Sequence, residues 1–450
     1  MKQDKSGFWK SICADPDDDV PRLVFADYLD EHGQPERAEL IRAQCDLETL
    51  PLSDPRRLDL EMTARRLLHE HYEEWVEELP KWVNRQTVTF RRGFPYGIRV
   101  TSSAYHRHCS AMAKRTVIQQ LALRDRFWHA GAHERIETVG QLERLRVLNS
   151  SIGMDSELEW FLPRLTGIQE LTLDSPCGVN VPSPADKFRA LLASTPMTQV
   201  RQLNLKTSHF NSTTGRRVFR ELTSVDWPHL KHLGLFEGDY YHGAIDSTLL
   251  DNLIETYSAC EIESLALQPF AQGLGLAPLL RLEQLQSLNL RITSASGIIA
   301  DLLDVVPQLK NLSRLSIREV PDTETHSLPE LANLEQLHDL TLTTTWRQEG
   351  INDLAASGRA SHLLRLGVGM CNSPFDLTSF AKVARLPRLR YLILPDSIST
   401  PNLEGLKALA DSPHLPDLKM VVFGYSVTQE LFQEQQEQFP DRFQIIQELL

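Results

Sequence analysis

Histidine and carboxylate pairs are the first places to look for catalytic or metal chemistry in this chain. His129 and His133 stand four residues apart, a spacing that brings two rings to one side of a helix, where they could bind a metal ion. Only Glu134 lies beside them and no HExxH motif is formed, while His69 and His71, two residues apart, do not converge on a helix. The sequence has no GxSxG, Walker A or Rossmann glycine motif. We therefore expect a non-enzymatic protein without a cofactor, a metal or a small-molecule substrate.

Arginines offer a different chemistry, the binding of charged partners. Arg291, Arg314, Arg318 and Arg365 flank leucines of a repeated motif that predicts parallel strands. Because neighbouring strands lie about 4.8 Å apart, the four side chains could form one basic patch. Guanidinium forks suit carboxylate or phosphate groups, so the patch favours an acidic partner surface. Asp339 falls inside the patch and could instead pair with one of the arginines.

Aromatic side chains form a second set of candidate partner-binding residues. Tyrosine and tryptophan often anchor protein interfaces. Aromatic residues in the loops of a repeat protein can also simply cover the edges of repeats, so both interpretations stay open. The set comprises Phe236, Tyr240 and Tyr241 of one loop, Trp346 of another, and Tyr391 beside a strand leucine.

A leucine motif must position these residues. The chain has 70 leucines, of which 54 lie between Leu142 and Leu418. The pattern L-x-x-L-x-x-L-x-L recurs eleven times, with closing apolar pairs from Leu145/Val147 to Val421/Phe423 at spacings of 23 to 32 residues. This periodicity is typical of leucine-rich repeats, in which each repeat supplies a strand and a return element. The final L-x-L has the period of a strand with one buried face.

The repeats predict an α/β leucine-rich-repeat solenoid. Helical returns, for example over 215–223, 246–257 and 401–411, favour a ribonuclease-inhibitor-like horseshoe with a parallel sheet inside and helices outside. The residues that flank the strand leucines would then lie on the concave face, the usual binding surface of such a solenoid.

Charge divides the remaining chain. Residues 1–80 carry a net charge of −10, and residues 81–135 a net charge of +9. Three helices are expected in the acidic segment, the first of them, over 21–32, with Leu23, Val24, Tyr28 and Leu29 at helical spacing. The acidic run 17–19 is interpreted as helix-capping carboxylates, because it lacks the alternating order of a calcium loop. In the basic segment we expect a hairpin around 91–96, followed by a helix over 104–123.

Two interpretations of the basic segment stay open. Its arginines, among them Arg85, Arg91, Arg92 and Arg99, could contact the phosphates of a nucleic acid. They could equally neutralise the acidic helices within the same chain. The overall net charge of −13 would repel a polyanion at long range, which favours the second interpretation.

A resemblance extends over Asp15–Gln44. The stretch contains the runs Asp15–Asp19, Pro21-Arg22-Leu23, Ala26–Leu29, His32-Gly33 and Arg37-Ala38-Glu39, followed by Ile41-Arg42 and Gln44. In these runs it resembles the repeat-companion domain found at the N-terminus of many bacterial repeat proteins. In that family the domain often precedes leucine-rich repeats through a basic segment with an Arg-Arg-Gly-Phe turn, and Arg91–Phe94 matches this turn. The resemblance implies an architecture and no known activity.

We therefore expect four parts: an acidic helical repeat-companion domain (1–80), a basic hairpin-helix cap (81–135), about eleven leucine-rich repeats (136–426) and a C-terminal cap (427–450). The expected function is a protein-binding scaffold that uses the concave face, with nucleic-acid binding through 81–135 as the alternative. The sequence has no apolar run long enough to span a membrane and no apolar leader, and its six scattered cysteines suit a reducing cytoplasm.

Overall fold

A computed structural model gives the structure of the chain. It describes residues 5–77, 79–101, 104, 107–108, 117–123, 147–150, 167–174, 199–206, 213–225, 227–236, 245, 247–258, 260–270, 275–292, 298–318, 330–343, 348–369, 375–394, 403–423 and 443–447. The chain divides into two compact units, Met1–Gly243 with Leu450 (unit 1) and Ala244–Leu449 (unit 2).

Unit 1 begins with four helices, α1 (Lys5–Ala14), α2 (Val20–Glu31), α3 (Pro35–Thr49) and α4 (Arg56–Val76). Proline occupies the first turn of α2 and of α3, where its missing N–H costs no hydrogen bond. Helix α2 buries Arg22, Phe25, Ala26 and Leu29. The apolar pattern expected for this helix is wrong in one respect: Leu23 and Val24 lie on the opposite face, with 38% and 50% of their surfaces exposed.

The helices share their core with the hairpin that follows them. Strand β1 (Thr89–Arg91) pairs antiparallel with β2 (Phe94–Val100), as expected for the basic segment. Phe94, which is 1% exposed, belongs to the same apolar cluster as Ile12, Phe25 and Ile41 of α1, α2 and α3. The ring of Trp9 meets the ring of Phe94 edge-on at a centroid distance of 5.3 Å. Residues on both sides of position 80 therefore contribute to one core.

The sheet of unit 1 runs in the order β1 to β7, and the strands from β2 onward are parallel. Its later strands are β3 (Gln120–Leu123), β4 (Val147–Ser150), β5 (Glu170–Asp174), β6 (Gln202–Lys206) and β7 (His232–Phe236), with α9 (Thr213–Thr223) between β6 and β7.

Two sequence predictions for this sheet are wrong. The helix expected over 104–123 does not reach its end, because Gln120–Leu123 is a strand that pairs with β2. The first repeat is also out of register. Leu148, and not Leu145, pairs with Leu171, because the strand takes its place from its neighbours in the sheet.

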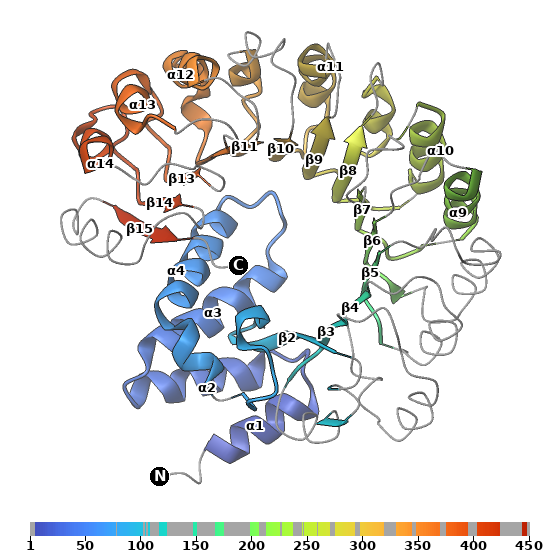
Figure 1. Ribbon diagram of the computed structural model, residues 1–450, viewed down its shortest axis with the longest axis vertical. Helices are drawn as coiled ribbons and strands as arrows, with labels where there is room; N and C mark the ends of the chain where they lie inside the picture. The colour runs from blue at the N-terminus through green and yellow to red at the C-terminus, as the bar shows by residue number, and fades with distance from the viewer. Residues whose placement is uncertain are drawn as a thin grey trace. The chain divides into compact units, whose positions relative to one another are not determined.

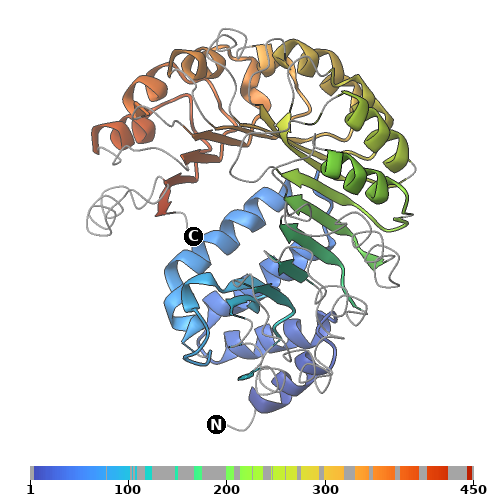
Figure 2. The same ribbon diagram turned by 45° about the vertical axis from the view of Figure 1, so that its right-hand side comes forward.

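The described residues of unit 2 form eight parallel strands in the order β8 to β15. They are β8 (Ser264–Phe270), β9 (Ser287–Ile292), β10 (Arg314–Arg318), β11 (Asp339–Thr343), β12 (Arg365–Gly369), β13 (Tyr391–Leu394), β14 (Met420–Phe423) and β15 (Gln444–Gln447). The return elements are α10 (Ser247–Tyr257), η5 (Ala277–Arg281), α11 (Ile298–Val305), η6 (Val306–Gln308), α12 (Gln348–Ala356), η8 (Arg359–His362), α13 (Leu377–Val383) and α14 (Leu403–Asp411). Helices α10 to α14 follow one face of this sheet (Figures 1 and 2).

The leucine motif explains this arrangement residue by residue. In one repeat Leu279, Leu282, Leu285, Leu288 and Leu290 are all at most 3% exposed. The first three lie in tight turns, in which the amide of Leu282 donates to the carbonyl of Leu279 and the amide of Leu285 to that of Leu282. The last two lie in β9 and point toward the helices. Each fully buried leucine contributes about 2 kcal/mol of hydrophobic stabilisation.

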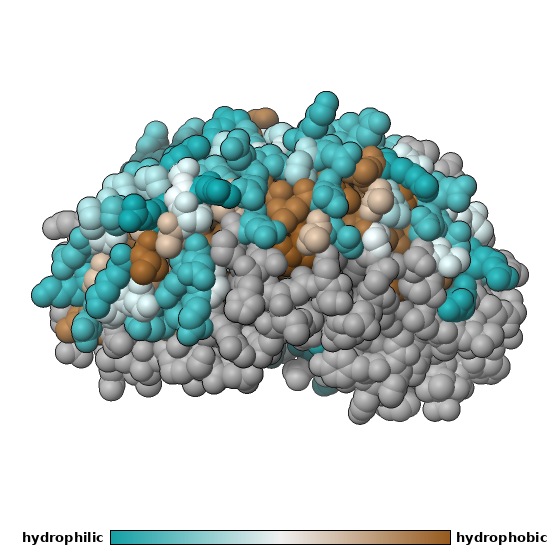
Figure 3. Space-filling view, turned by 90° about the horizontal axis from the view of Figure 1, so that it is seen from above, coloured by the Kyte–Doolittle hydropathy of each residue, from teal (hydrophilic) through white to brown (hydrophobic). Residues whose placement is uncertain are grey.

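The same buried positions repeat from strand to strand and pair in register. One such row, from β9 to β13, consists of Leu288, Leu315, Leu340, Leu366 and Leu392. The fold is therefore an α/β leucine-rich-repeat solenoid, as the sequence predicts. Of the expected C-terminal cap, 427–450, the structure describes only residues 443–447. Seen from above, the described surface is mainly hydrophilic, with apolar side chains in smaller patches (Figure 3).

Candidate functional site

On β9 to β12 the second face of the sheet in unit 2 carries mainly polar side chains, and we call this part the polar face. On β13 and β14 the same face instead carries Tyr391, Ile393, Met420 and Val422, which are at most 9% exposed. Because side chains alternate along a strand, the residues between and beside the buried leucines lie on this face. The strand register arranges them in rows. One row contains Ser287, Arg314, Asp339 and Arg365 on β9 to β12, and the next contains Asn289, Ser316, Thr341 and Gly367.

An ion pair between neighbouring strands lies at the centre of the first row. The Nε of Arg365 donates to Oδ1 of Asp339 at 2.8 Å, and Nη2 of Arg365 contacts the other carboxylate oxygen. Only 18% of the Arg365 side chain and 5% of the Asp339 side chain are exposed. Asp339 thus pairs with an arginine of the predicted patch, which is one of the two interpretations offered by the sequence. Because of this ion pair, Arg365 adds little to the net positive charge of the patch.

Of the other three arginines, one lies beside this ion pair and two lie at the far end of the strands. Arg314 is beside Asp339 on β10, while Arg291 and Arg318 are direct register partners on β9 and β10. The Arg291–Arg318 pair stands four residues along the strands from Arg314, about 13 Å at 3.3 Å per residue. Arg291 and Arg314 are half-buried and Arg318 is exposed. With four arginines and one aspartate, the polar face of β9 to β12 has a net charge of +3 over its described residues.

Two of the five predicted aromatic residues lie in the described part of the chain, one in each unit. Phe236 is half-buried at the end of β7 in unit 1, and Tyr391 on β13 is only 3% exposed. Tyr240, Tyr241 and Trp346 lie outside the described residues. The described side chains that lie between the arginines in the next row, Asn289, Ser316 and Thr341, are polar and half-buried.

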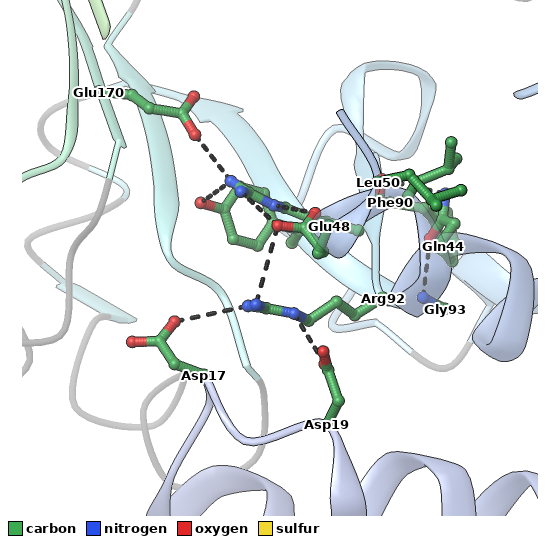
Figure 4. A network of polar contacts seen from close by, with 12 residues as sticks. Asp17, Asp19, Gln44, Glu48, Leu50, Phe90, Arg92, Gly93 and Glu170 are labelled. Atoms are coloured by element: carbon green, nitrogen blue, oxygen red, sulfur yellow. Dashed lines mark hydrogen bonds and ion pairs between the residues drawn. The ribbon is translucent and has the colours of Figure 1, made fainter. Parts of the chain in front are cut away.

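The arginines of the hairpin turn are engaged within the chain (Figure 4). Both nitrogens Nε and Nη2 of Arg91 donate to the carboxylate of Glu48 at 2.7 Å. Nη1 of Arg91 donates to Oε1 of Glu170 at 2.7 Å and to the hydroxyl of Tyr96 at 2.9 Å. Arg91 therefore joins helix α3 to strand β5.

Arg92 joins the same turn to the acidic run before α2. Its Nε lies 2.8 Å from Oδ1 of Asp19, and its Nη1 lies 3.5 Å from Oδ1 of Asp17 (Figure 4). The capping role expected for these carboxylates is wrong for Asp19, which occupies the N-cap position of α2 without a side-chain cap bond. Asp18 does accept from a backbone amide in the first turn, that of Val20 at 2.9 Å.

Burial and ion pairing act in opposite directions on Glu48. Burial alone would raise the pKa of its carboxyl, but the hydrogen bonds from Arg91 and the charges of Arg91, Arg92 and Arg57 outweigh burial and hold this pKa below its usual value. Glu48 is therefore charged at neutral pH. These contacts favour the interpretation in which the basic segment neutralises the acidic helices, because Arg91 and Arg92 are occupied by carboxylates.

Within the described residues, no helix is long and apolar enough to cross a membrane, and no group of three or more His, Cys, Asp or Glu side chains could hold a metal ion. His129 and His133 lie outside those residues.

No protein-family model and no curated protein sequence matches the chain. Among solved structures, the crystal structure of the Rad7 and Elc1 complex in yeast is similar at 13% identity, over 94% of both chains, with a TM-score of 0.41. A protein from Bacteroides fragilis is similar at 12% identity over 76% of both chains (TM-score 0.33), and an internalin from Listeria monocytogenes at 15% identity over 64% of this chain and 88% of that one (TM-score 0.26). At these identities the similarity does not extend to what the protein binds.

Proposed function

We propose that the protein is a non-enzymatic scaffold that binds a protein partner on the polar face of unit 2. The supporting observation is the net charge of +3 on β9 to β12, from arginines held at fixed positions by the strand register. Arginine forks match the carboxylates of an acidic protein surface in geometry and charge. Arg291, Arg314 and Arg318 would make these contacts, while Arg365 would act through its pair with Asp339.

A rigid sheet is well suited to such recognition. Each strand is held by its neighbours on both sides and by buried leucines beneath, so the arginines lose little backbone entropy when a partner binds. Oppositely charged surfaces also accelerate the encounter and suppress unsuitable partners.

Charge reversal tests this proposal. We expect a variant with Arg291→Glu, Arg314→Glu and Arg318→Glu to lose the protein partner that the unchanged chain captures from the native cell lysate. A matched control with Arg281→Glu, Lys310→Glu and Arg385→Glu changes the net charge equally at exposed positions in the returns of the same unit, and should keep the partner. Arg365 is left unchanged because its reversal would break the ion pair with Asp339.

Two outcomes would contradict the proposal. One is a partner that both triple variants retain equally, which would exclude the polar face. The other is capture of nucleic acid as the main component, lost at high salt, which would favour the basic segment as the binding site.

We also infer that residues 1–80 are a repeat-companion domain, with residues 81–135 as the cap that joins it to the repeats. The motifs of the resemblance support this inference, since Asp17, Asp19 and Gln44 of the helical segment all contact the Arg92-Gly93 turn. The scattered cysteines and the companion family further support a bacterial, cytoplasmic protein.

A further inference from the structure

A cavity of about 250 Å³ lies among the four helices and strand β2 of unit 1. Four aromatic side chains line it: Trp9 of α1, Phe25 of α2, Trp75 of α4 and Phe94 of β2. Typical sites for whole small molecules range from about 300 to 1,000 Å³. The size of this cavity therefore suits a single bulky side chain better than an entire cofactor.

A buried cation forms part of the cavity wall. Arg37 of α3 is only 9% exposed, and its guanidinium carbon lies 4.6 Å from the ring centroid of Trp75, 5.3 Å from that of Phe90 and 5.7 Å from that of Phe94. A cation attracts the face of any aromatic ring placed within about 6 Å of it. An aromatic side chain that enters the cavity would gain this attraction together with edge-to-face contacts to the rings. An aliphatic side chain would gain burial alone.

The polar lining of the cavity carries the opposite charge. Glu36 of α3 is exposed and lines the cavity, and so does Glu74 of α4, whose side chain is 71% exposed. These two exposed carboxylates would attract a cation that reaches the cavity. Oε2 of Glu74 also lies 3.6 Å from Nδ1 of His71, another residue of the lining.

We propose that this cavity binds one aromatic side chain of a basic peptide segment in a partner protein. The aromatic ring would fill the space beside Arg37, and lysines or arginines on either side would pair with Glu36 and Glu74. This inference goes beyond the function proposed for unit 2 and does not depend on it, because the cavity and all of its lining residues lie in unit 1.

Three short peptides test the chemistry of the occupant. The probe is acetyl-Lys-Lys-Phe-Lys-Lys-amide, titrated into the full chain by isothermal calorimetry at low salt. One control replaces Phe by Ala, and the other replaces the four lysines by glutamates. We expect the probe to bind at least tenfold more tightly than either control. Equal affinity of the Phe and Ala peptides would overturn the aromatic anchor, and equal affinity of the two Phe peptides would overturn the role of charge.

Variants of the chain locate the binding. Gln34 is exposed and lines the cavity, so Gln34→Phe places a larger side chain there without removing a core residue. This variant should lower the affinity for the probe about tenfold. Glu36→Gln combined with Glu74→Gln should weaken it three- to tenfold. The matched control Glu73→Gln removes an exposed carboxylate from the same helix α4 outside the cavity lining and should change affinity less than twofold. Unchanged binding in the Gln34 variant, with circular dichroism confirming its fold, would overturn the proposal.

Discussion

Arg92 and Gly93 both have positive φ angles, 51° and 79°, and they form the two-residue turn between β1 and β2. A two-residue turn of this kind matches the twist of a hairpin and requires positive φ at both positions. The amide of Gly93 donates to Oε1 of Gln44 at 2.7 Å, which holds the turn against α3. The Arg-Arg-Gly-Phe motif thus serves a structural purpose: two arginines reach carboxylates, and the glycine allows close approach to a helix.

Replacement of Gly93 tests this close approach. A Cβ atom at position 93 would overlap the side chain of Ile41 and lie 2.7 Å from its Cα. We expect Gly93→Ala to lower the free energy of unfolding by more than about 3 kcal/mol, from positive φ and overlap together. Urea denaturation measures the change.

Gly33 provides the matched control, because it has a φ of +74° and no atom within 4 Å of an added Cβ. Gly33→Ala should cost only the backbone strain, about 1–2 kcal/mol. If the two variants lost the same stability, the contact with Ile41 would not be what requires glycine at position 93.

The lowered pKa of Glu48 predicts a pH dependence. A carboxyl whose pKa is lower in the folded than in the unfolded chain stabilises the fold above its unfolded pKa of about 4.3. That stabilisation is lost as pH falls through the folded pKa. Glu48→Gln should therefore destabilise the chain at pH 7 and have a smaller effect at pH 3, below the unfolded pKa. Urea titrations at both values measure this difference, and an equal loss at both would contradict the role of the Glu48 charge.

At the scale of elements, the pairing between β11 and β12 combines backbone hydrogen bonds with the Asp339–Arg365 ion pair. Both side chains are largely removed from water, which makes each dependent on the other. The strand order fixes this pairing, because Asp339 and Arg365 are 26 residues apart in the chain and directly opposite in register.

Breaking the ion pair should be costly. We expect Asp339→Asn to lower the free energy of unfolding by about 3 kcal/mol, because it leaves the Arg365 charge poorly solvated. Adding Arg365→Gln should restore part of this loss, so that the double variant is less destabilised than the sum of the single ones. Additive losses, measured by urea denaturation, would show that the two side chains are not coupled.

The repeated elements were predictable because their signal is local. Within one repeat the leucines specify the turn and the strand by themselves, so β5 to β14 follow from the motif. Strand β3 and the register of β4 could not be predicted in this way. Leu121 has no leucine motif before it. The motif of Leu142, Leu145 and Leu148 ends on Ser150 instead of an apolar residue, so the sequence pattern places the apolar pair three residues too early, at Leu145/Val147. The strand positions of the four arginines were predictable, but which arginine Asp339 contacts depends on side-chain geometry.

Helix α2 shows the limit of periodicity in a short amphipathic segment. Two apolar stripes are possible there, one through Leu23 and Val24 and one through Phe25 and Leu29. The structure buries the second, together with Arg22, whose Nη1 donates to the carbonyl of Asp18 at 2.8 Å. The cavity next to this helix was beyond sequence analysis, because its wall combines residues from four helices and a strand.

At the scale of the whole molecule, each repeat of a solenoid contacts mainly its neighbours, so stability is distributed along the array. The N-terminal helices differ, since their core includes Phe94 of β2. Folding of the helices and of the first hairpin is therefore coupled in unit 1.

Hydrogen exchange distinguishes the shared core of the helices and the hairpin in unit 1 from the contacts between neighbouring repeats in unit 2. Phe94→Ala should cost about 3–5 kcal/mol and speed amide exchange in α1, α2 and α3 as well as in β2. Leu315→Ala in unit 2 should cost about 2–5 kcal/mol and speed exchange in β9, β10 and β11, with α1 to α3 unaffected. If amide exchange became faster only in β2 of the Phe94→Ala variant, this would contradict a shared core.

The central claim, that the polar face of unit 2 binds a protein partner, is tested most directly by photo-crosslinking. A photoreactive benzoylphenylalanine is placed at Ser316, on the polar face between the arginines, or at the exposed Ala300 of α11. After irradiation in the native cell lysate, we expect the Ser316 variant to form a protein crosslink that the Ala300 variant lacks. Crosslinks formed only from Ala300 would place the partner on the helices and contradict the account.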